Sequence, residues 1–142
     1  MSVVIICRSA LADSVLGDMA LAIELAKRDK SPMVVLTAEA LRAIAGQSFA
    51  WSPLLQTRPV RMGIIRAAAE QGYPLAAEWD KRWADLSRLM QAAREAGVQL
   101  VACPIWQALL GIDSNLPDFI TRTNLDDYLR MLESAETVIG GY

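Results

Sequence analysis

The apolar residues of this chain form short continuous runs that alternate with stripes at helical spacing. Val3 to Ile6 form an unbroken β-branched run, and a second run covers Met33 to Leu36. Between them an apolar stripe recurs at Val15, Met19, Ile23 and Ala26. Continuous runs are typical of strands buried on both faces, and such a stripe is typical of a helix packed on a sheet. Residues 2–36 therefore predict a βαβ unit with parallel strands, its helix capped by Asp13 or Ser9.

The middle of the chain predicts two further helices. Thr37 has the character of an N-cap, and Gly46 ends the short helix that follows it. Pro59 is suited to the first turn of a helix that runs to about Gln71. A strand over residues 60–65 is the alternative.

Two aromatic segments flank the Pro59 helix. The apolar residues of 47–57 recur at no regular spacing, so this segment is predicted to be an ordered loop beside a crevice or an oligomer interface. Residues 75–96 predict a long helix, because apolar residues repeat at helical spacing at Trp79, Trp83, Leu86, Met90 and Ala93. We expect this stripe to pack onto the sheet, with an interface role as the alternative.

The last third of the chain continues the same alternation. Val98 to Ala102 is a short apolar run between Gly97 and the Cys103-Pro104 pair, which predicts a buried parallel strand. A helix over Trp106–Leu110 and a short strand within Pro117–Arg122 follow.

The chain is predicted to close with a helix and a strand. Thr123 and Asp126 have the spacing of a capping box. The apolar face of the helix is formed by Leu125, Tyr128, Leu129 and Leu132. Residues 137–140 form the last strand. Together these elements predict one domain over residues 1–142, with a three-layer, flavodoxin-like α/β fold. A mainly parallel sheet of about five strands would carry helices on both faces.

Composition narrows the possible partners. Hydrophobic residues make up 54% of the 142 residues, above the usual share of about 45–50%, yet no apolar run approaches the length of a membrane span. We therefore expect the excess apolar surface to be buried between copies in a homo-oligomer. A net charge of −2, with scattered basic residues, argues against nucleic acid and membranes as partners. The N-terminus lacks the pattern of a signal peptide, so we expect a cytoplasmic protein.

The chain contains no histidine and two cysteines. The absence of histidine excludes a histidine general base, a Ser-His-Asp triad and any histidine metal site. Without an export signal, the cysteines are expected to be free thiols. We expect no metal and no organic cofactor. The spacings of the cysteine, arginine and glycine residues match none of four known motifs. These are the phosphatase loop, the Walker loop, the dinucleotide-binding turn and the Cys-x-x-Cys pair.

Both cysteines are predicted at the carboxyl ends of strands, the edge where open parallel sheets bind ligands. If the strand order were 2-1-3-4-5, Cys7 and Cys103 would lie on neighbouring strands and face one crevice. Cys103 precedes the helix of Trp106, with Pro104 at its first position, and a helix N-terminus favours a thiolate. Arg8 could supply a nearby cation. The alternative is that each thiol is simply a small buried hydrophobe.

Three segments resemble the DsrE/DsrF-like family, which includes the TusD-type sulfur-relay proteins. The first is Val3–Cys7 with the small residues Ala20-Leu21-Ala22, and the second is Val34–Gly46. The third and most informative is Ala96–Ile112, which contains Ala96-Gly97-Val98, Ala102-Cys103 and Gly111-Ile112. The last helix and the closing strand also fit. The resemblance covers most of the chain except residues 47–75.

The resemblance implies a small α/β domain that assembles as trimers or hexamers. In active members, the cysteine matching Cys103 accepts sulfane sulfur as a persulfide and passes it to a partner protein. This chemistry needs an accessible thiolate and no histidine, metal or organic cofactor. The chain departs from the family pattern at Pro104-Ile105-Trp106, which is bulkier than the small polar residues often found there and could bury the thiol.

Three hypotheses follow. The first is a sulfur carrier of the sulfurtransferase type, with Cys103 as the persulfide site, Cys7 nearby, and donor and acceptor proteins as partners. The second is a non-catalytic oligomeric module that binds a small ligand or a protein in the crevice, using Trp106 and the 47–57 loop. The third is a thiol redox sensor in which Cys7 and Cys103 pair, which requires their Cα atoms to lie within about 7 Å.

Overall fold

A computed structural model describes residues 2–46, 49–75, 86–112 and 115–140. Five strands and six α-helices are assigned within these residues. The strands are β1 (Val3–Cys7), β2 (Pro32–Leu36), β3 (Gln99–Ala102), β4 (Thr121–Arg122) and β5 (Thr137–Gly140). The helices are α1 (Ala12–Lys27), α2 (Ala38–Gly46), α3 (Arg58–Glu70), α4 (Ser87–Glu95), α5 (Pro104–Leu110) and α6 (Leu125–Ser134). A single 3₁₀ turn, Pro53–Leu55, precedes α3.

The five strands form one all-parallel sheet in the order β4-β3-β2-β1-β5. This confirms the predicted α/β class and the parallel sheet. The strand order differs from the 2-1-3-4-5 order considered above, because β2 pairs with both β1 and β3 and so separates them. Which strands become neighbours is not encoded in the local apolar pattern that predicts the strands themselves.

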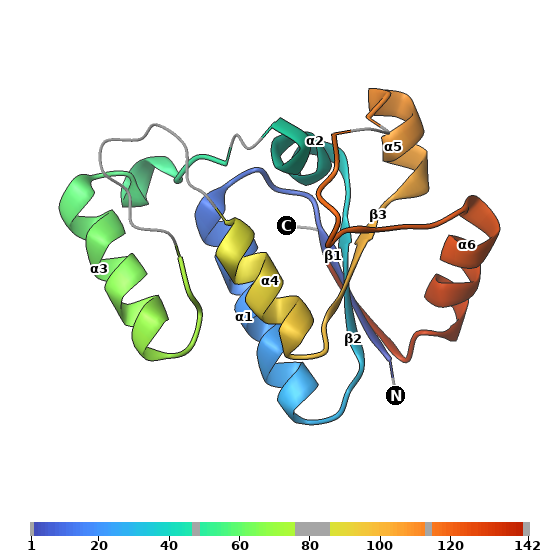
Figure 1. Cartoon of the computed structure of the whole chain (residues 1–142), viewed down its shortest axis with the longest axis horizontal. Coiled ribbons are helices and arrows are strands. Elements are labelled where there is room, and N and C mark those ends of the chain that lie inside the picture. The colour runs from blue at the N-terminus through green and yellow to red at the C-terminus, as the bar shows by residue number, and fades with distance from the viewer. Residues whose placement is uncertain (1, 47–48, 76–85, 113–114, 141–142) are drawn as a thin grey trace.

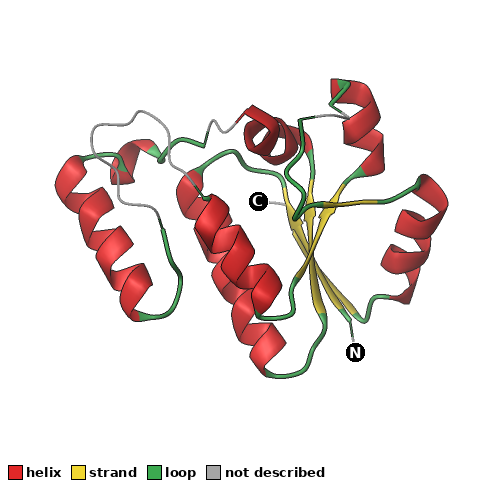
Figure 2. Cartoon of the chain, viewed as in Figure 1, coloured by secondary structure: helices red, strands yellow, loops and turns green. Residues whose placement is uncertain are grey.

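Helices cover both faces of the sheet, as Figures 1 and 2 show. Helices α1 and α4 pack side by side on one face, and α6 lies on the other. Alternate residues of β1 and β2 enter different clusters of buried side chains. Ile5, Val34 and Leu100 belong to the larger cluster beneath α1 and α4, whereas Val4 and Val35 belong to a smaller cluster beneath α6. The two faces of the sheet are therefore unequally packed.

The helix over residues 58–70 confirms the helix predicted from Pro59, which lies in its first turn. Helix α4 is the described part of the helix predicted over residues 75–96. Its residues Met90 and Ala93 are buried against the larger cluster, which confirms core packing for this part of the stripe. Residues 76–85, with Trp79 and Trp83, lie outside the described part of the chain.

Two predicted helix caps are wrong because neighbouring groups replace them. The N-cap of α1 is Leu11, which has no side-chain cap, and the N–H of Ala12 instead donates to the carbonyl of Ala50 at 2.7 Å. Asp13 accepts from the N–H of Ser52 at 2.9 Å, and Ser9 Oγ accepts from the N–H of Leu11 at 3.1 Å, ahead of the helix. These contacts fix the 49–52 segment against the start of α1.

The N-cap of α6 is Asn124 rather than Thr123. Its side-chain oxygen accepts from the N–H of Asp127 at 2.8 Å, and its amide donates to the Asp127 carboxylate at 3.0 Å. None of the described helices is long and apolar enough to cross a membrane.

Candidate functional site

Cys7 and Cys103 lie at the carboxyl edge of the sheet, as predicted. Cys7 is the last residue of β1 and is in register with Leu36, which is in register with Ala102 at the end of β3. Cys103 follows Ala102, and its N–H donates to the carbonyl of Leu36 at 3.0 Å. Cys103 therefore lies one residue further along the strand direction than Cys7, with β2 between their strands.

The structure does not bring the two thiols together. Cys7 belongs to the larger cluster beneath α1, whereas Cys103 belongs to the smaller cluster with Val4, Val35 and Tyr128. The side chains thus lie on opposite faces of the sheet. Two strand spacings amount to roughly 10 Å, beyond the Cα separation of about 7 Å that a disulfide tolerates. Cys7 therefore occupies a different site from Cys103.

The Cys7 thiol is fully buried and held in its protonated form. Burial raises its pKa well above the ordinary value, and the nearby Asp18 carboxylate, which accepts a hydrogen bond from the thiol, raises it further. A hydrogen bond with the Ser9 backbone N–H lowers the pKa of the thiol, but by less than these two effects raise it. Burial likewise raises the pKa of Asp18. A protonated, enclosed sulfur is a poor nucleophile, so Cys7 fits the alternative of a small buried hydrophobe.

The Cys103 side chain is buried beside a tyrosine of the last helix. Cys103 is the N-cap residue of α5, and its carbonyl accepts from the N–H of Gln107 at 2.9 Å. Its side chain makes no cap hydrogen bond to the helix. Instead, it is buried beside Tyr128 of α6, in the smaller cluster. Burial, followed by the Cys103 sulfur, raises the pKa of Tyr128 to about 12.

Tyr128 and Asp18 were not singled out from the sequence, although each carried a signal. Tyr128 belongs to the apolar stripe of the last helix, and a buried tyrosine hydroxyl needs a hydrogen-bond partner. Asp18 lies one helical turn from Val15 at the margin of an apolar stripe. Neither signal identifies the partner, because each cysteine lies on a different element.

The other predicted site residues surround the carboxyl edge. Pro104 is the first residue of α5, as expected, and Trp106 is 38% exposed on the same helix. Arg8 is exposed one residue beyond β1. The described part of the 47–57 loop lies elsewhere, because Phe49 and Trp51 are buried in the larger cluster on the opposite face from Cys103.

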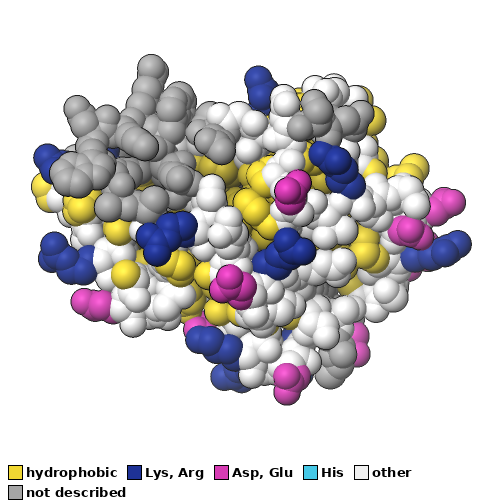
Figure 3. All heavy atoms as spheres, viewed as in Figure 1, with side chains coloured by type: hydrophobic (Ala, Val, Ile, Leu, Met, Phe, Trp, Pro, Cys, Tyr) yellow, Lys and Arg dark blue, Asp and Glu magenta, His cyan; other side chains and the backbone are white. Residues whose placement is uncertain are grey.

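Apolar side chains are exposed on α5 and α6 close to Cys103. We call them the α5–α6 surface, and they are Ile105, Trp106, Leu109, Leu125 and Leu129. Leu109 is 68% exposed, and the two helices are in contact. Figure 3 shows yellow side chains reaching the right-hand edge of the molecule, where Figure 1 places these helices.

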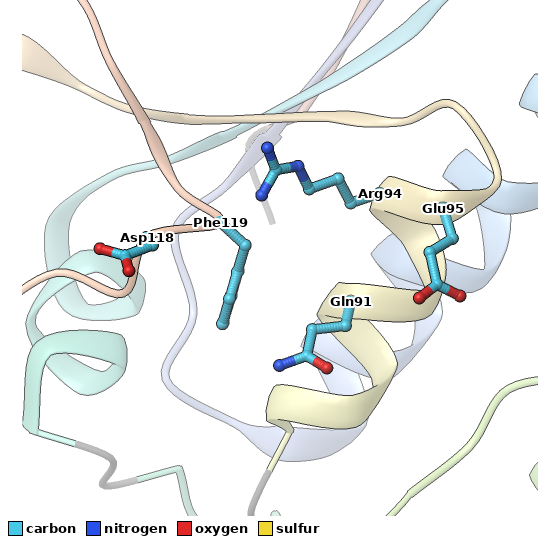
Figure 4. A pocket seen from close by; sticks show the side chains of 5 residues that line it. All are labelled: Gln91, Arg94, Glu95, Asp118 and Phe119. Carbon is cyan, nitrogen blue, oxygen red and sulfur yellow. The ribbon is translucent and has the colours of Figure 1, made fainter.

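A hollow of about 500 Å³ lies between α4 and the segment before β4. It is lined by Gln91, Arg94, Glu95, Asp118 and Phe119. In Figure 4, Gln91 and Phe119 extend toward one another, and Asp118 points away. None of the lining residues is a predicted site residue. The described residues contain no group of three or more cysteine, aspartate or glutamate side chains that could hold a metal ion.

Comparison with solved structures identifies the fold. The crystal structure of the ychN protein from E. coli superimposes with a TM-score of 0.62, over 99% of this chain and 99% of that chain. The chain has the YchN fold. This is a DsrE/DsrF-like fold, and the described residues of this chain form its five-stranded parallel sheet and six α-helices. The two sequences are 16% identical, so the likeness to YchN concerns the fold alone.

No family model matches the chain, and no curated protein does. The resemblance noted in the sequence thus agrees with the YchN fold, while sulfur transfer and the oligomeric state remain predictions.

Proposed function

We propose that this protein is a DsrE-like sulfur carrier that accepts sulfane sulfur on Cys103 and passes it to a partner protein. The observation that carries the proposal is the position of Cys103 at the carboxyl edge of β3, where its side chain is buried beside Tyr128 of α6. The YchN fold and the family pattern around Ala102-Cys103 support it. Cys7 has no role in this proposal, because it faces the other side of the sheet.

The transfer is an exchange between sulfur atoms. The Cys103 thiol first loses its proton to solvent, and the thiolate attacks the outer sulfur of a donor persulfide or polysulfide. A new S–S bond forms on Cys103, the S–S bond of the donor breaks, and the donor leaves as a thiolate or shortened polysulfide. An acceptor thiolate then attacks the outer sulfur, and Cys103 leaves as a thiolate. No external oxidant, metal or cofactor takes part.

The exposed neighbourhood of Cys103 provides a place for partners. Cys103 itself is 4% exposed, so the sulfur reacts only after a local opening. The α5–α6 surface beside it is apolar, and exposed apolar surface is typical of protein interaction sites. We propose that this surface contacts other copies of the chain, in a trimer or hexamer. Light scattering at micromolar concentration tests the assembly, and a monomer would contradict it.

Intact-mass analysis after incubation with polysulfide tests the carrier function. We expect a reductant-reversible gain of one sulfur atom that is lost in Cys103→Ser. Cys7→Ser is the matched control, because it removes the other thiol from the opposite face of the sheet and is expected to load normally. If wild type gains no sulfur, or if Cys103→Ser still gains it, the proposal fails.

A non-catalytic binding module is the second candidate function, and the hollow beside α4 favours it. Arg94 offers a cation and Phe119 an aromatic ring to one space, which suits a small ligand with a carboxylate and an apolar part. Benzoate is a suitable probe. NMR shifts at the hollow that disappear in Arg94→Ala would support this function, and the absence of shifts at millimolar benzoate would count against it.

A further inference from the structure

The sheet has two edge strands, and they differ in length and charge. β4 consists of two residues and includes Arg122, whereas β5 consists of four residues, Thr137–Gly140, and none of them is charged. Among the described residues, β5 pairs with β1 alone. The outer side of an edge strand presents backbone N–H and C=O groups that can bind another molecule. β5 therefore offers main-chain hydrogen-bonding groups along its outer side.

A pocket of about 270 Å³ opens between β5 and the second half of α1. Its apolar lining is entirely aliphatic and consists of Val3, Leu21, Leu25 and Ile139. Leu21 is 39% exposed, so a ligand in the pocket would remove apolar surface from water. Two charged residues also line the pocket, Lys30 before β2 and Glu136 before β5.

This pocket is separate from the site of Cys103. Val3 and Thr137 are the first residues of β1 and β5 and are in register, so the pocket lies at the amino ends of these strands. Val3 and Ile139 pack in the larger cluster, whereas Cys103 belongs to the smaller cluster and follows the carboxyl end of β3. The two sites therefore lie at opposite ends and on opposite faces of the sheet.

The charges of the pocket indicate the chemistry of its ligand. An ammonium group such as that of Lys30 binds a carboxylate, and a carboxylate such as that of Glu136 binds an ammonium group. A ligand with only one charge would meet a like charge in the pocket, whereas a zwitterion satisfies both. The volume is below the range of about 300–1,000 Å³ that is typical of sites for drug-sized ligands, so it suits a smaller molecule.

We propose that this pocket binds a free α-amino acid with an aliphatic side chain, such as L-leucine. Lys30 holds the carboxylate, Glu136 holds the ammonium group, and the side chain lies against the aliphatic lining. The edge of β5 is suited to the same ligand, because an amino acid carries its donor and its acceptor at the spacing of a strand residue.

Charge also distinguishes this ligand from two other occupants. Within a longer peptide, the ammonium and carboxylate groups of an aliphatic residue are replaced by neutral amides. A second copy that paired through its own β5 would bring an uncharged strand to Lys30 and Glu136. Neither occupant complements both charges, so the free amino acid is favoured.

Titration of the full chain with L-leucine, followed by the amide NMR signals, tests the proposal. We expect saturable shifts at Leu21, Thr137 and Ile139 at millimolar concentration or below. Three matched ligands identify the groups that are recognised. N-acetyl-L-leucine lacks the ammonium group, L-leucinamide lacks the carboxylate, and L-alanine lacks most of the side chain. Each should bind about tenfold more weakly than L-leucine, as expected when one charged hydrogen bond or a buried aliphatic group is lost.

Two substitutions assign the charges to their partners. Lys30→Gln should weaken L-leucine binding about tenfold and remove the preference for L-leucine over L-leucinamide. Glu136→Gln should weaken it similarly and remove the preference over N-acetyl-L-leucine. A merely structural role would weaken all these ligands alike in both variants. Glu133→Gln is the matched control, because Glu133 is an exposed carboxylate on α6, on the other face of the sheet, and it should leave binding unchanged.

Several outcomes would overturn the proposal. The first is the absence of saturable shifts, and the second is equal binding of L-leucine and its two capped forms. Equal binding of N-acetyl-L-leucinamide would indicate an added peptide strand instead. Shifts at the same amides on dilution without ligand would indicate a second copy. Cys103→Ser should bind L-leucine as wild type does, so the result does not depend on sulfur transfer.

Discussion

Cys7 and Cys103 both lie at the carboxyl edge of the sheet, one residue out of register, and their side chains are on opposite faces with β2 between their strands. The thiol redox sensor would need the two sulfurs to meet. Because the sheet itself separates them, oxidation cannot join them unless strands are rearranged.

We therefore expect no intramolecular disulfide after mild oxidation. The measurement is intact mass under non-reducing, denaturing conditions, where a bridge removes the mass of two hydrogens. Cys103→Ser is the control that cannot form the bridge. A bridged species in wild type at full occupancy, with native circular dichroism retained, would restore the redox hypothesis.

Stability should decline at alkaline pH because the fold holds Tyr128 in its protonated form. Its pKa in the folded protein, about 12, is above its ordinary value of 10.0. This contribution is fully present below pH 10 and is lost as the pH rises through about 12. We expect a loss of the order of 1 kcal/mol in the free energy of unfolding over that range, measured by urea denaturation.

Tyr128→Phe is the control for this prediction, because its ring cannot ionise. The Cys7 thiol, whose pKa is also raised, titrates in both proteins and so does not contribute to the difference between them. We expect the variant to show a flatter dependence on pH above 10. Parallel curves for the two proteins would show that Tyr128 contributes nothing.

Asn124→Ala should destabilise the protein by about 1 kcal/mol, the usual cost of losing an N-cap. Asn124 accepts from the N–H of Asp127 and donates to its carboxylate. Thr123→Ala is the matched control and should change stability by less than about 0.5 kcal/mol. Its hydroxyl makes only a 3.4 Å contact with the carbonyl of Asn124. Chemical denaturation measures the stability of both variants. A larger loss in Thr123→Ala than in Asn124→Ala would show that Thr123 is the N-cap after all.

Gly140→Ala should cost about 1–3 kcal/mol, because an added Cβ would lie 2.9 Å from the Cβ of Ile6 and overpack the contact between β5 and β1. Gly63→Ala is the matched control in the middle of α3, where an added Cβ meets nothing within 4 Å. Gly63→Ala should instead raise the free energy of unfolding by about 0.5–1 kcal/mol, since alanine favours the helix more than glycine does. Thermal or urea unfolding tests both, and equal effects at the two positions would contradict the close approach of β5.

The sequence alone determined the elements and the fold class. The run Val3–Ile6, the stripe from Val15 and the Gly97-to-Pro104 segment predicted strands and helices that the structure contains, because burial imposes a local period on each element. The position of Cys103 at the carboxyl end of a strand was also predictable, since Pro104 ends the run.

Only the tertiary structure decided which groups meet. The order β4-β3-β2-β1-β5 separates the two cysteines, and it results from pairing between strands that are distant in the chain. The contacts of Cys103 with Tyr128 and of Cys7 with Asp18 likewise join residues on different elements. The spacing of apolar residues along one element shows that a side chain faces a core. It does not show which face of the sheet that core covers. The packing of the helices on the two faces makes that choice, and it placed one thiol beneath α1 and the other beneath Tyr128.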